Sequence, residues 1–273
     1  MQESRKREIR IKAEGFRSNC KVSKYGIIDL FKECHRLGYK LLRYPLGNNA
    51  DLGFAMKKNN DVVIFTNTTS RLSREIFTLA HEIGHVILHL DNVPSFIDTS
   101  STISSRTSDI IEQESNYFAA CLLMPADEVD KFLDLEIDGF TENSLSAMDI
   151  ARLMSEFNVS FDMALNRLEN LGKIDMYQHQ LLDTEKNEIR VGNLLRAVGG
   201  NAKLNVASNE IDLPHEFIDY AIYNYNHKAI PRETLERVLD YYRLTMDDIA
   251  DSLVQRTEED SDDLDLLIGE LED

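Results

Sequence analysis

The sequence lacks long apolar runs and has little cysteine. No stretch of its 273 residues approaches the roughly 18 consecutive apolar residues that a membrane-spanning helix needs. The first residues, MQESRKREIRIKAEGF, carry charges throughout and contain no apolar segment like that of a secretory signal. Cys20, Cys34 and Cys121 are odd in number and widely spaced, which favours free thiols in a reducing compartment. We therefore expect a cytoplasmic protein with no membrane association.

Basic residues are also scarce relative to acidic ones. The chain has 30 Lys and Arg against 48 Asp and Glu, a net charge of −18. A protein with this negative charge repels the phosphate backbone of nucleic acids, so direct nucleic-acid binding is not expected. A basic protein partner is compatible with the charge. Residues 257–273 carry nine acidic and no basic side chains. We expect this segment to be a disordered acidic tail.

Hydrophobic periodicity predicts a mixed α and β protein. The expected elements are a helix at 24–38, a strand at 39–46, a hairpin of strands 54–58 and 61–67 around Asn59-Asn60, a long helix at 68–90, a polar loop at 92–108, a helix at 109–124, two helices within 144–174 joined near 158–160, a polar stretch of loop or strand at 175–212, and a helix pair within 213–253. We expect one strand of the hairpin to lie at a sheet edge and to bind an extended peptide as an added strand, through Val62, Val63, Ile64, Phe65, Thr66 and Asn67.

The stretch FTLAHEIGHVILHLD, residues 77–91, contains an HExxH pattern. In a helix, residues four apart lie on one face with Cβ atoms about 5–6 Å apart. His81 and His85 can therefore converge on one metal ion, and Glu82 is placed as general base for the attacking water. The alternative is an amphipathic core helix that carries histidines by chance. His89 cannot join the pair, because three histidines at spacings of four span about 12 Å of a straight helix.

The third metal ligand must therefore come from another element. The helix predicted at 109–124 offers Glu112 and Glu114. Glu112 shares a face with small side chains that allow close helix packing, whereas Glu114 points about 200° away from it. We expect Glu112 to be the third ligand, with Asn116 one turn later hydrogen-bonded to a ligand imidazole. Tyr117, His89 and His215 stay open as donors to an oxyanion.

Two motifs in this order resemble those of the ImmA/IrrE metallopeptidases. RLSREIFTLAHEIGHVILH is similar to the histidine helix of that family, and IEQESNYFAACLLMP to its glutamate helix, with Ser115 where the family usually has alanine. The similarity covers roughly residues 24–174. It implies the zinc ligands His81, His85 and Glu112 and the general base Glu82, in agreement with the spacing argument.

The resemblance also implies an α+β fold with a zincin-like metallopeptidase core. The expected core has a small, mainly antiparallel sheet with an HExxH helix and a glutamate-bearing helix, and a largely helical region follows it. We expect a core at 1–126, a helix-turn-helix-like region at 127–175, a mostly helical region at 176–256 and the acidic tail at 257–273.

The function implied by the resemblance is a zinc-dependent intracellular endopeptidase, with manganese as a substitute in vitro, that cleaves a helix-turn-helix repressor. One alternative is an anti-repressor that sequesters its repressor without proteolysis. Another is a DNA-binding regulator with a metal sensor, which the acidic charge disfavours.

Overall fold

The computed structural model describes residues 1–48, 50, 52–58, 61–90, 95–98 and 109–253, with only the backbone at 58 and 95–98. The chain divides into two compact units, Met1–Leu213 and Pro214–Asp273. The expected acidic tail at 257–273 and the expected turn at Asn59-Asn60 lie outside the described residues. In the described part of the chain, no helix has the length and apolar character needed to cross a membrane.

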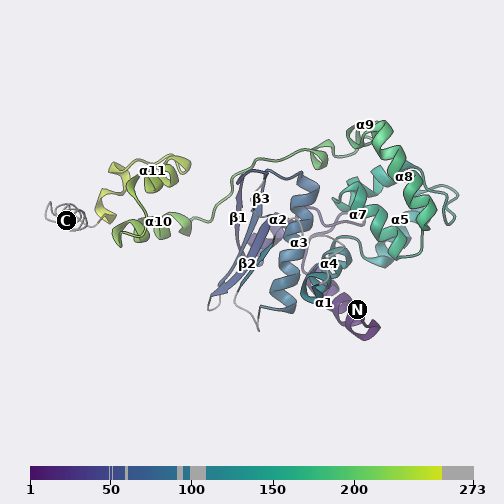
Figure 1. The fold of residues 1–273 in the computed structure, drawn as a ribbon, viewed down its shortest axis with the longest axis horizontal. Coiled ribbons are helices and arrows are strands. Elements are labelled where there is room, and N and C mark those ends of the chain that lie inside the picture. The colour runs from purple at the N-terminus through teal and green to yellow at the C-terminus, as the bar shows by residue number, and fades with distance from the viewer. Residues whose placement is uncertain (49, 51, 59–60, 91–94, 99–108, 254–273) are drawn as a thin grey trace, which may run out of the picture. The chain divides into compact units, whose positions relative to one another are not determined.

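Unit 1 combines one small sheet with many helices (Figure 1). Its elements are α1 (Glu3–Arg17), α2 (Leu30–Arg36), β1 (Lys40–Tyr44), β2 (Gly53–Lys58), β3 (Asp61–Asn67), α3 (Leu72–Leu88), β4 (Ser95–Asp98), α4 (Ile110–Leu123), α5 (Ala126–Glu136), α6 (Ala147–Phe157), α7 (Phe161–Asn170), α8 (Met176–Ile189), α9 (Val191–Ala197) and the 3-10 helix η1 (Ala202–Asn205). The fold is therefore of the expected α+β class.

The sheet has the strand order β1-β3-β2-β4. β2 pairs antiparallel with both β3 and β4, and β1 pairs parallel with β3. The expected hairpin is confirmed, because Lys58 pairs with Asp61 across a two-residue connection. The expected edge position of residues 62–67 is wrong: β3 is a central strand, bonded along its length to β1 and β2. Its backbone groups are already paired, so Val62–Asn67 cannot take up a peptide as an added strand.

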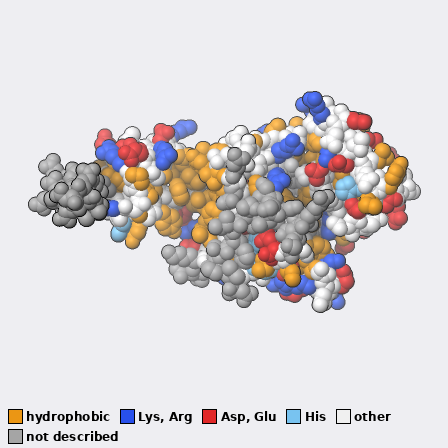
Figure 2. Space-filling view, in the orientation of Figure 1, with side chains coloured by type: hydrophobic (Ala, Val, Ile, Leu, Met, Phe, Trp, Pro, Cys, Tyr) orange, Lys and Arg blue, Asp and Glu red, His pale blue; other side chains and the backbone are white. Residues whose placement is uncertain are grey.

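Helices α2 and α3 lie on one face of the sheet. α3 packs against β2 and β3, α2 packs against β1, and the two helices contact each other. Ile64 and Ala55, paired across β3 and β2, are fully buried. The neighbouring pair Phe54 and Phe65, whose ring centroids lie 5.2 Å apart, points to the other face because side chains alternate along a strand. Figure 2 shows hydrophobic side chains gathered over part of the sheet.

Helix α4 packs against α3 on one side and α1 on the other. α3 and α4 can approach closely because Gly84 has no side chain: a Cβ there would lie 3.1 Å from Ser115 Cα and 3.3 Å from Phe118 Cβ. The sequence did not lead us to expect α1, whose buried side chains Ile9, Ala13 and Phe16 are separated by charged residues.

Helices α5–α9 continue from α4 and share its core. One cluster of buried side chains runs from Ile9 in α1 to Leu204 in η1, so α3, α4 and the helices that follow them are packed together. Helices α6 and α7 meet at Asn158–Ser160 as expected, with Asn158 at φ 55° and Ser160 as N-cap. The finer division of this unit at residues 126 and 175 stays a prediction. The polar stretch 175–212, expected to be loop or strand, instead contains α8 and α9.

Residues 202–213, here called the strap, run back over the sheet and the start of α3. Asp212 forms an antiparallel bridge with Arg43 of β1, and Ala207 forms another with Arg71. The strap also contributes to a buried polar group around Glu75 of α3. Arg43 Nε donates to Glu75 Oε1 over 2.7 Å, and Ser208 Oγ donates to Oε2 over 3.1 Å. The first turn of α3 is thereby fixed to the sheet and to the strap.

Unit 2 is helical in its described part. It contains α10 (Glu216–Asn226), α11 (Arg232–Tyr241) and the 3-10 helix η2 (Asp247–Ser252). This agrees with the expected helix pair. The unit has its own small buried cluster, formed by Ala221, Tyr225, Leu235, Leu239 and Ile249.

Candidate metal centre

Helix α3 brings three polar side chains into the interior of unit 1. His81, Glu82 and His85 have no solvent-exposed surface. The two imidazole rings are inclined by 76°, and their Nε2 atoms lie 2.9 Å apart. Burying two imidazoles whose nitrogen atoms face one point destabilises the folded protein unless a charged partner or a metal ion lies there. Their arrangement indicates a ligand pair rather than core packing.

Helix α4 supplies the carboxylate of Glu112 at the same point. Its Oε2 lies 3.2 Å from His81 Nε2 and its Oε1 lies 3.4 Å from His85 Nε2. The side chain comes from the first turn of α4. This helix is capped by Asp109, whose carboxylate accepts a hydrogen bond from the Ile111 amide. Because α4 crosses α3 closely at Gly84, the side chain of Glu112 is near enough to contact both histidines.

These three residues form the one His, Cys, Asp and Glu cluster with metal-site geometry among the described residues, their ligand atoms all within 4.8 Å of one another. Ligand atoms about 2.0–2.1 Å from one tetrahedral zinc ion lie about 3.3–3.4 Å from one another. The separations between Glu112 and the two histidines match this value, and that between the imidazoles is slightly shorter. The donor set of two imidazoles and one carboxylate also leaves a fourth position for water or substrate, as a catalytic zinc site requires.

Asn116 orients one of the imidazoles. Its Oδ1 lies 3.0 Å from His81 Nδ1, one turn of α4 beyond Glu112. An amide oxygen can only accept, so the Nδ1 atom of His81 carries the proton and its Nε2 lone pair faces Glu112 and His85. The contact expected from the sequence is therefore present.

The carboxylate of Glu82 lies against the first residue of β2. A Cβ atom placed on Gly53 would be 2.7 Å from Glu82 Oε1 and 2.6 Å from Thr78 Cγ2. Glu82 therefore occupies space that only a glycine leaves open at the beginning of this strand. Its backbone directly follows His81, so the carboxylate belongs to the same helix segment as the ligand pair.

Glu114 and His89 take no part in the three-residue cluster. Glu114 points to α1, where Arg5 donates to its two oxygens over 2.9 and 2.6 Å. His89 is the C-cap of α3, with Nε2 3.7 Å from Glu114 Oε2. Burial, together with the nearby His85, lowers the pKa of His89 to about 4, so its imidazole is neutral at pH 7.

Neither of the remaining oxyanion candidates is assigned to the cluster. The Tyr117 hydroxyl accepts a hydrogen bond from Arg10 on α1, over 3.0 Å, on the side of α4 that also carries Glu114. His215 belongs to unit 2, whereas the metal centre belongs to unit 1. No donor to an oxyanion is therefore assigned.

The sequence comparisons agree with this geometry. Residues 34–169 match the model of the Peptidase M78 family, described as the IrrE N-terminal-like domain. The match contains both α3 and α4, and therefore all three converging side chains and Glu82. The chain belongs to the ImmA/IrrE family.

A curated relative of this ImmA/IrrE chain is the radiation response metalloprotease IrrE of Deinococcus radiodurans. The two are 39% identical over 77 residues, which is 26% of this chain and 22% of the relative. The chain thus spans about a fifth of the length of that relative. Membership of this metallopeptidase family implies a metal cofactor, and the His81, His85 and Glu112 side chains fit one.

Three contributors to the site were missed from the sequence. Gly53 makes room for Glu82, Gly84 makes room for α4, and Arg5 fixes Glu114 away from the ligands. Gly84 lies inside the HExxH motif, so its value for close helix packing could have been recognised. Gly53 and Arg5 act across distances in sequence that no local pattern records.

Proposed function

We propose that this chain is a zinc-dependent endopeptidase that acts in the cytoplasm on a helix-turn-helix transcriptional repressor. The observation that carries the proposal is the convergence of His81, His85 and Glu112, with Glu82 on the same helix turn as the ligands. Family membership supports protease chemistry in general. The three cysteines are free, which suits a reducing compartment.

The proposed mechanism assigns one task to each side chain. His81, His85 and Glu112 would hold the metal, and Asn116 fixes the tautomer of His81. A bound zinc ion would polarise the scissile carbonyl and lower the pKa of the attacking water. Glu82 accepts the proton of that water and delivers it to the leaving amine. Burial of Glu82 beside Gly53 keeps bulk water away from the carboxylate.

The substrate class rests on charge and on the relative. The net charge of −18 favours association with basic proteins, and DNA-binding repressors carry basic surfaces. The matched relative is named for a radiation response, which fits a protease that relieves repression under stress. Zinc is the metal proposed because two imidazoles and one carboxylate are a zinc donor set, and manganese is a substitute in vitro.

The deciding experiment incubates the purified, zinc-loaded chain with the repressor encoded nearest its gene. We expect one or a few defined cleavage products by mass spectrometry, with none after zinc removal by a chelator. Glu82→Gln should retain zinc and cleave about 10²–10⁴-fold more slowly, since it loses only the proton carrier. Glu188→Gln makes the same exchange at an exposed position of α8, so it is the matched control and should keep both zinc and the natural rate.

The alternative of an anti-repressor makes the opposite prediction. If Glu82→Gln switched the repressor off in cells as well as the natural chain does, repression would be relieved by binding and the proposed protease function would be wrong. Cleavage that persists at full rate in Glu82→Gln would instead show that another group acts as the base.

A further inference from the structure

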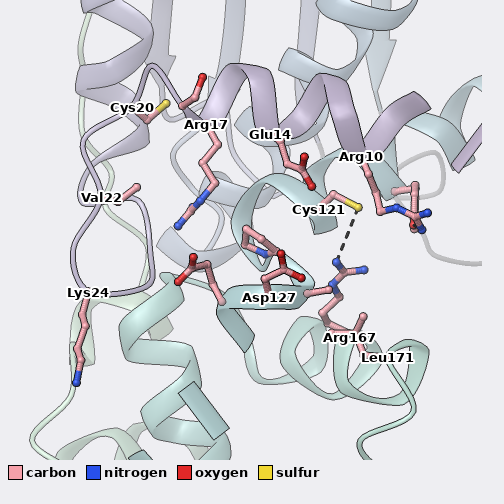
Figure 3. Close-up of a pocket in the computed structure, with 15 residues that line it drawn as sticks. Arg10, Glu14, Arg17, Cys20, Val22, Lys24, Cys121, Asp127, Arg167 and Leu171 are labelled. Carbon is pink, nitrogen blue, oxygen red and sulfur yellow. Dashed lines mark hydrogen bonds between the residues drawn. The ribbon is translucent and has the colours of Figure 1, made fainter. Parts of the chain in front are cut away.

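A cavity of about 580 Å³ lies on the side of α4 that faces α1 (Figure 3). Its wall is formed by α1, the residues after α1, the second half of α4, the beginning of α5 and the end of α7. Tyr117 and Cys121 of α4 line it. Neither Glu112 nor the two histidines do, so this cavity is separate from the metal centre.

Three arginines line the cavity without a carboxylate partner. Arg10 donates to the Tyr117 hydroxyl, and Arg17 donates to the carbonyl oxygens of Leu122 and Tyr25. Arg167 donates to the Met124 carbonyl over 2.9 Å and to Cys121 Sγ over 3.8 Å, the contact drawn as a dashed line in Figure 3. Within the described parts of the chain, no Asp or Glu oxygen lies within 4 Å of these guanidinium groups.

Two of these guanidinium groups are withdrawn from water, whereas Arg10 is partly exposed. Arg167 is only 4% exposed, and burial lowers the pKa of Arg17 from its ordinary value. Charged side chains at this depth are usually paired with an opposite charge, because desolvation of an unpaired ion is costly. Backbone carbonyls and a thiol supply hydrogen bonds here but no negative charge. In the described parts of the chain, the cavity therefore holds three guanidinium groups that no carboxylate pairs directly.

The acidic residues that line the cavity leave these three arginines without a direct ion pair. Glu14 and Asp127 line it from exposed positions, and Glu128, which also acts on Arg17, is ion-paired with Lys131 over 2.8 Å. Helix α5 also begins at the wall, and its N-cap, Pro125, provides no capping side chain. The free amides of a first helical turn favour an anion.

We propose that this cavity binds a small anionic molecule that carries a phosphate or carboxylate group. Guanidinium groups bind both through paired hydrogen bonds, and three of them line this one cavity. The bound anion would contact residues of α1, α4, α5 and α7. Of these helices, α4 carries Glu112 on the face opposite the cavity. Occupancy would thereby stabilise the helix that completes the metal centre without touching it. This proposal does not depend on the identity of the protein substrate.

The test compares the full, zinc-loaded chain with three variants in thermal unfolding and in calorimetric titration. Arg17→Gln and Arg10→Gln remove a cavity charge. Arg7→Gln removes an equal charge from an exposed position of the same helix and serves as the matched control. Inorganic phosphate and succinate are the two probes, and sodium chloride at equal ionic strength controls for screening.

When the anion is present at about ten times its dissociation constant, the midpoint temperature of thermal unfolding should rise by about 3–6 °C in the natural chain and in Arg7→Gln. At least half of that rise should be lost in Arg17→Gln and in Arg10→Gln, each compared with its own midpoint without anion. A phosphate effect without a succinate effect would identify a phosphate site, and the reverse a carboxylate site. If Arg17→Gln does not fold, Arg10→Gln carries the test.

Equal midpoint rises in all four proteins would overturn the proposal, because an anion at the metal centre or elsewhere would act alike on each. So would the lack of any heat or midpoint change in the natural chain with either probe.

Discussion

At the scale of single residues, the metal centre depends on two glycines as well as on its ligands. Gly84 lets α4 cross α3 with backbone contact at Ser115, and Gly53 leaves room for the carboxylate of Glu82. Neither glycine has a positive φ, so steric space and not backbone conformation is what each one contributes. Protein interiors are close-packed, so they tolerate an added methyl group poorly.

Gly53→Ala should slow the proposed cleavage while zinc stays bound. The added Cβ would lie 2.7 Å from Glu82 Oε1, so the carboxylate must move, and a displacement of this kind costs about 10²-fold in rate. Zinc content by atomic absorption and cleavage by mass spectrometry measure the two effects. Gly15→Ala on α1, where the Cβ has open space, is the control and should keep full activity. An unchanged rate in Gly53→Ala would show that Glu82 needs no fixed position.

Glu112→Ala should abolish stoichiometric zinc binding, whereas Glu114→Ala should retain it. Glu112 is the carboxylate within reach of both imidazoles, while Glu114 is held by Arg5 on the other side. Zinc per chain after dialysis is the measurement. Retention of zinc by Glu112→Ala, or its loss in a folded Glu114→Ala, would reverse the assignment of the third ligand.

At the scale of elements, local patterns and tertiary contacts were predictable to different degrees. α3 and the hairpin of β2 and β3 have strong apolar periodicity, and the HExxH spacing together with the small-residue face of α4 was enough to predict the metal cluster. The central position of β3 was not predictable, because strand order depends on partners distant in sequence. Helix α8 was missed since it buries only Leu182, which leaves almost no periodic signal.

Glu75→Gln should destabilise unit 1 by about 3–5 kcal/mol. The substitution keeps the size of the side chain but leaves the buried Arg43 guanidinium without its nearest charge, although Glu210 lies 3.0 Å away on the strap. Ser208→Ala removes one neutral donor to the same carboxylate and should cost about 1 kcal/mol. Urea unfolding measures both. Equal effects of the two substitutions would mean that the ion pair adds nothing beyond its hydrogen bonds.

At the scale of the whole molecule, the two units have separate buried clusters. The larger runs from Ile9 to Leu204 and the smaller lies within residues 221–249. The matched family domain, residues 34–169, lies entirely in unit 1, as do both helices that carry the metal cluster. Metal binding should therefore be a property of unit 1 alone.

A chain ending at Leu213 should fold cooperatively and bind one zinc ion, as the full chain should. A chain ending at Asn201 keeps every residue of the metal cluster but lacks the strap, and it should unfold at a lower urea concentration. The two truncations differ in the strap and not in the ligands, so their comparison isolates its effect. Loss of zinc binding on removal of unit 2 alone would contradict the separation of the units.

The strap also has a consequence for the order in which the chain becomes structured during synthesis. Ser208 reaches back 133 positions to Glu75, so the polar group at the start of α3 stays incomplete until almost all of unit 1 has been translated. Domains generally fold as units once their sequence is available, and contacts this distant form late. A ribosome-bound fragment that already contains every ligand will therefore still lack the contacts of the strap with the start of the histidine helix.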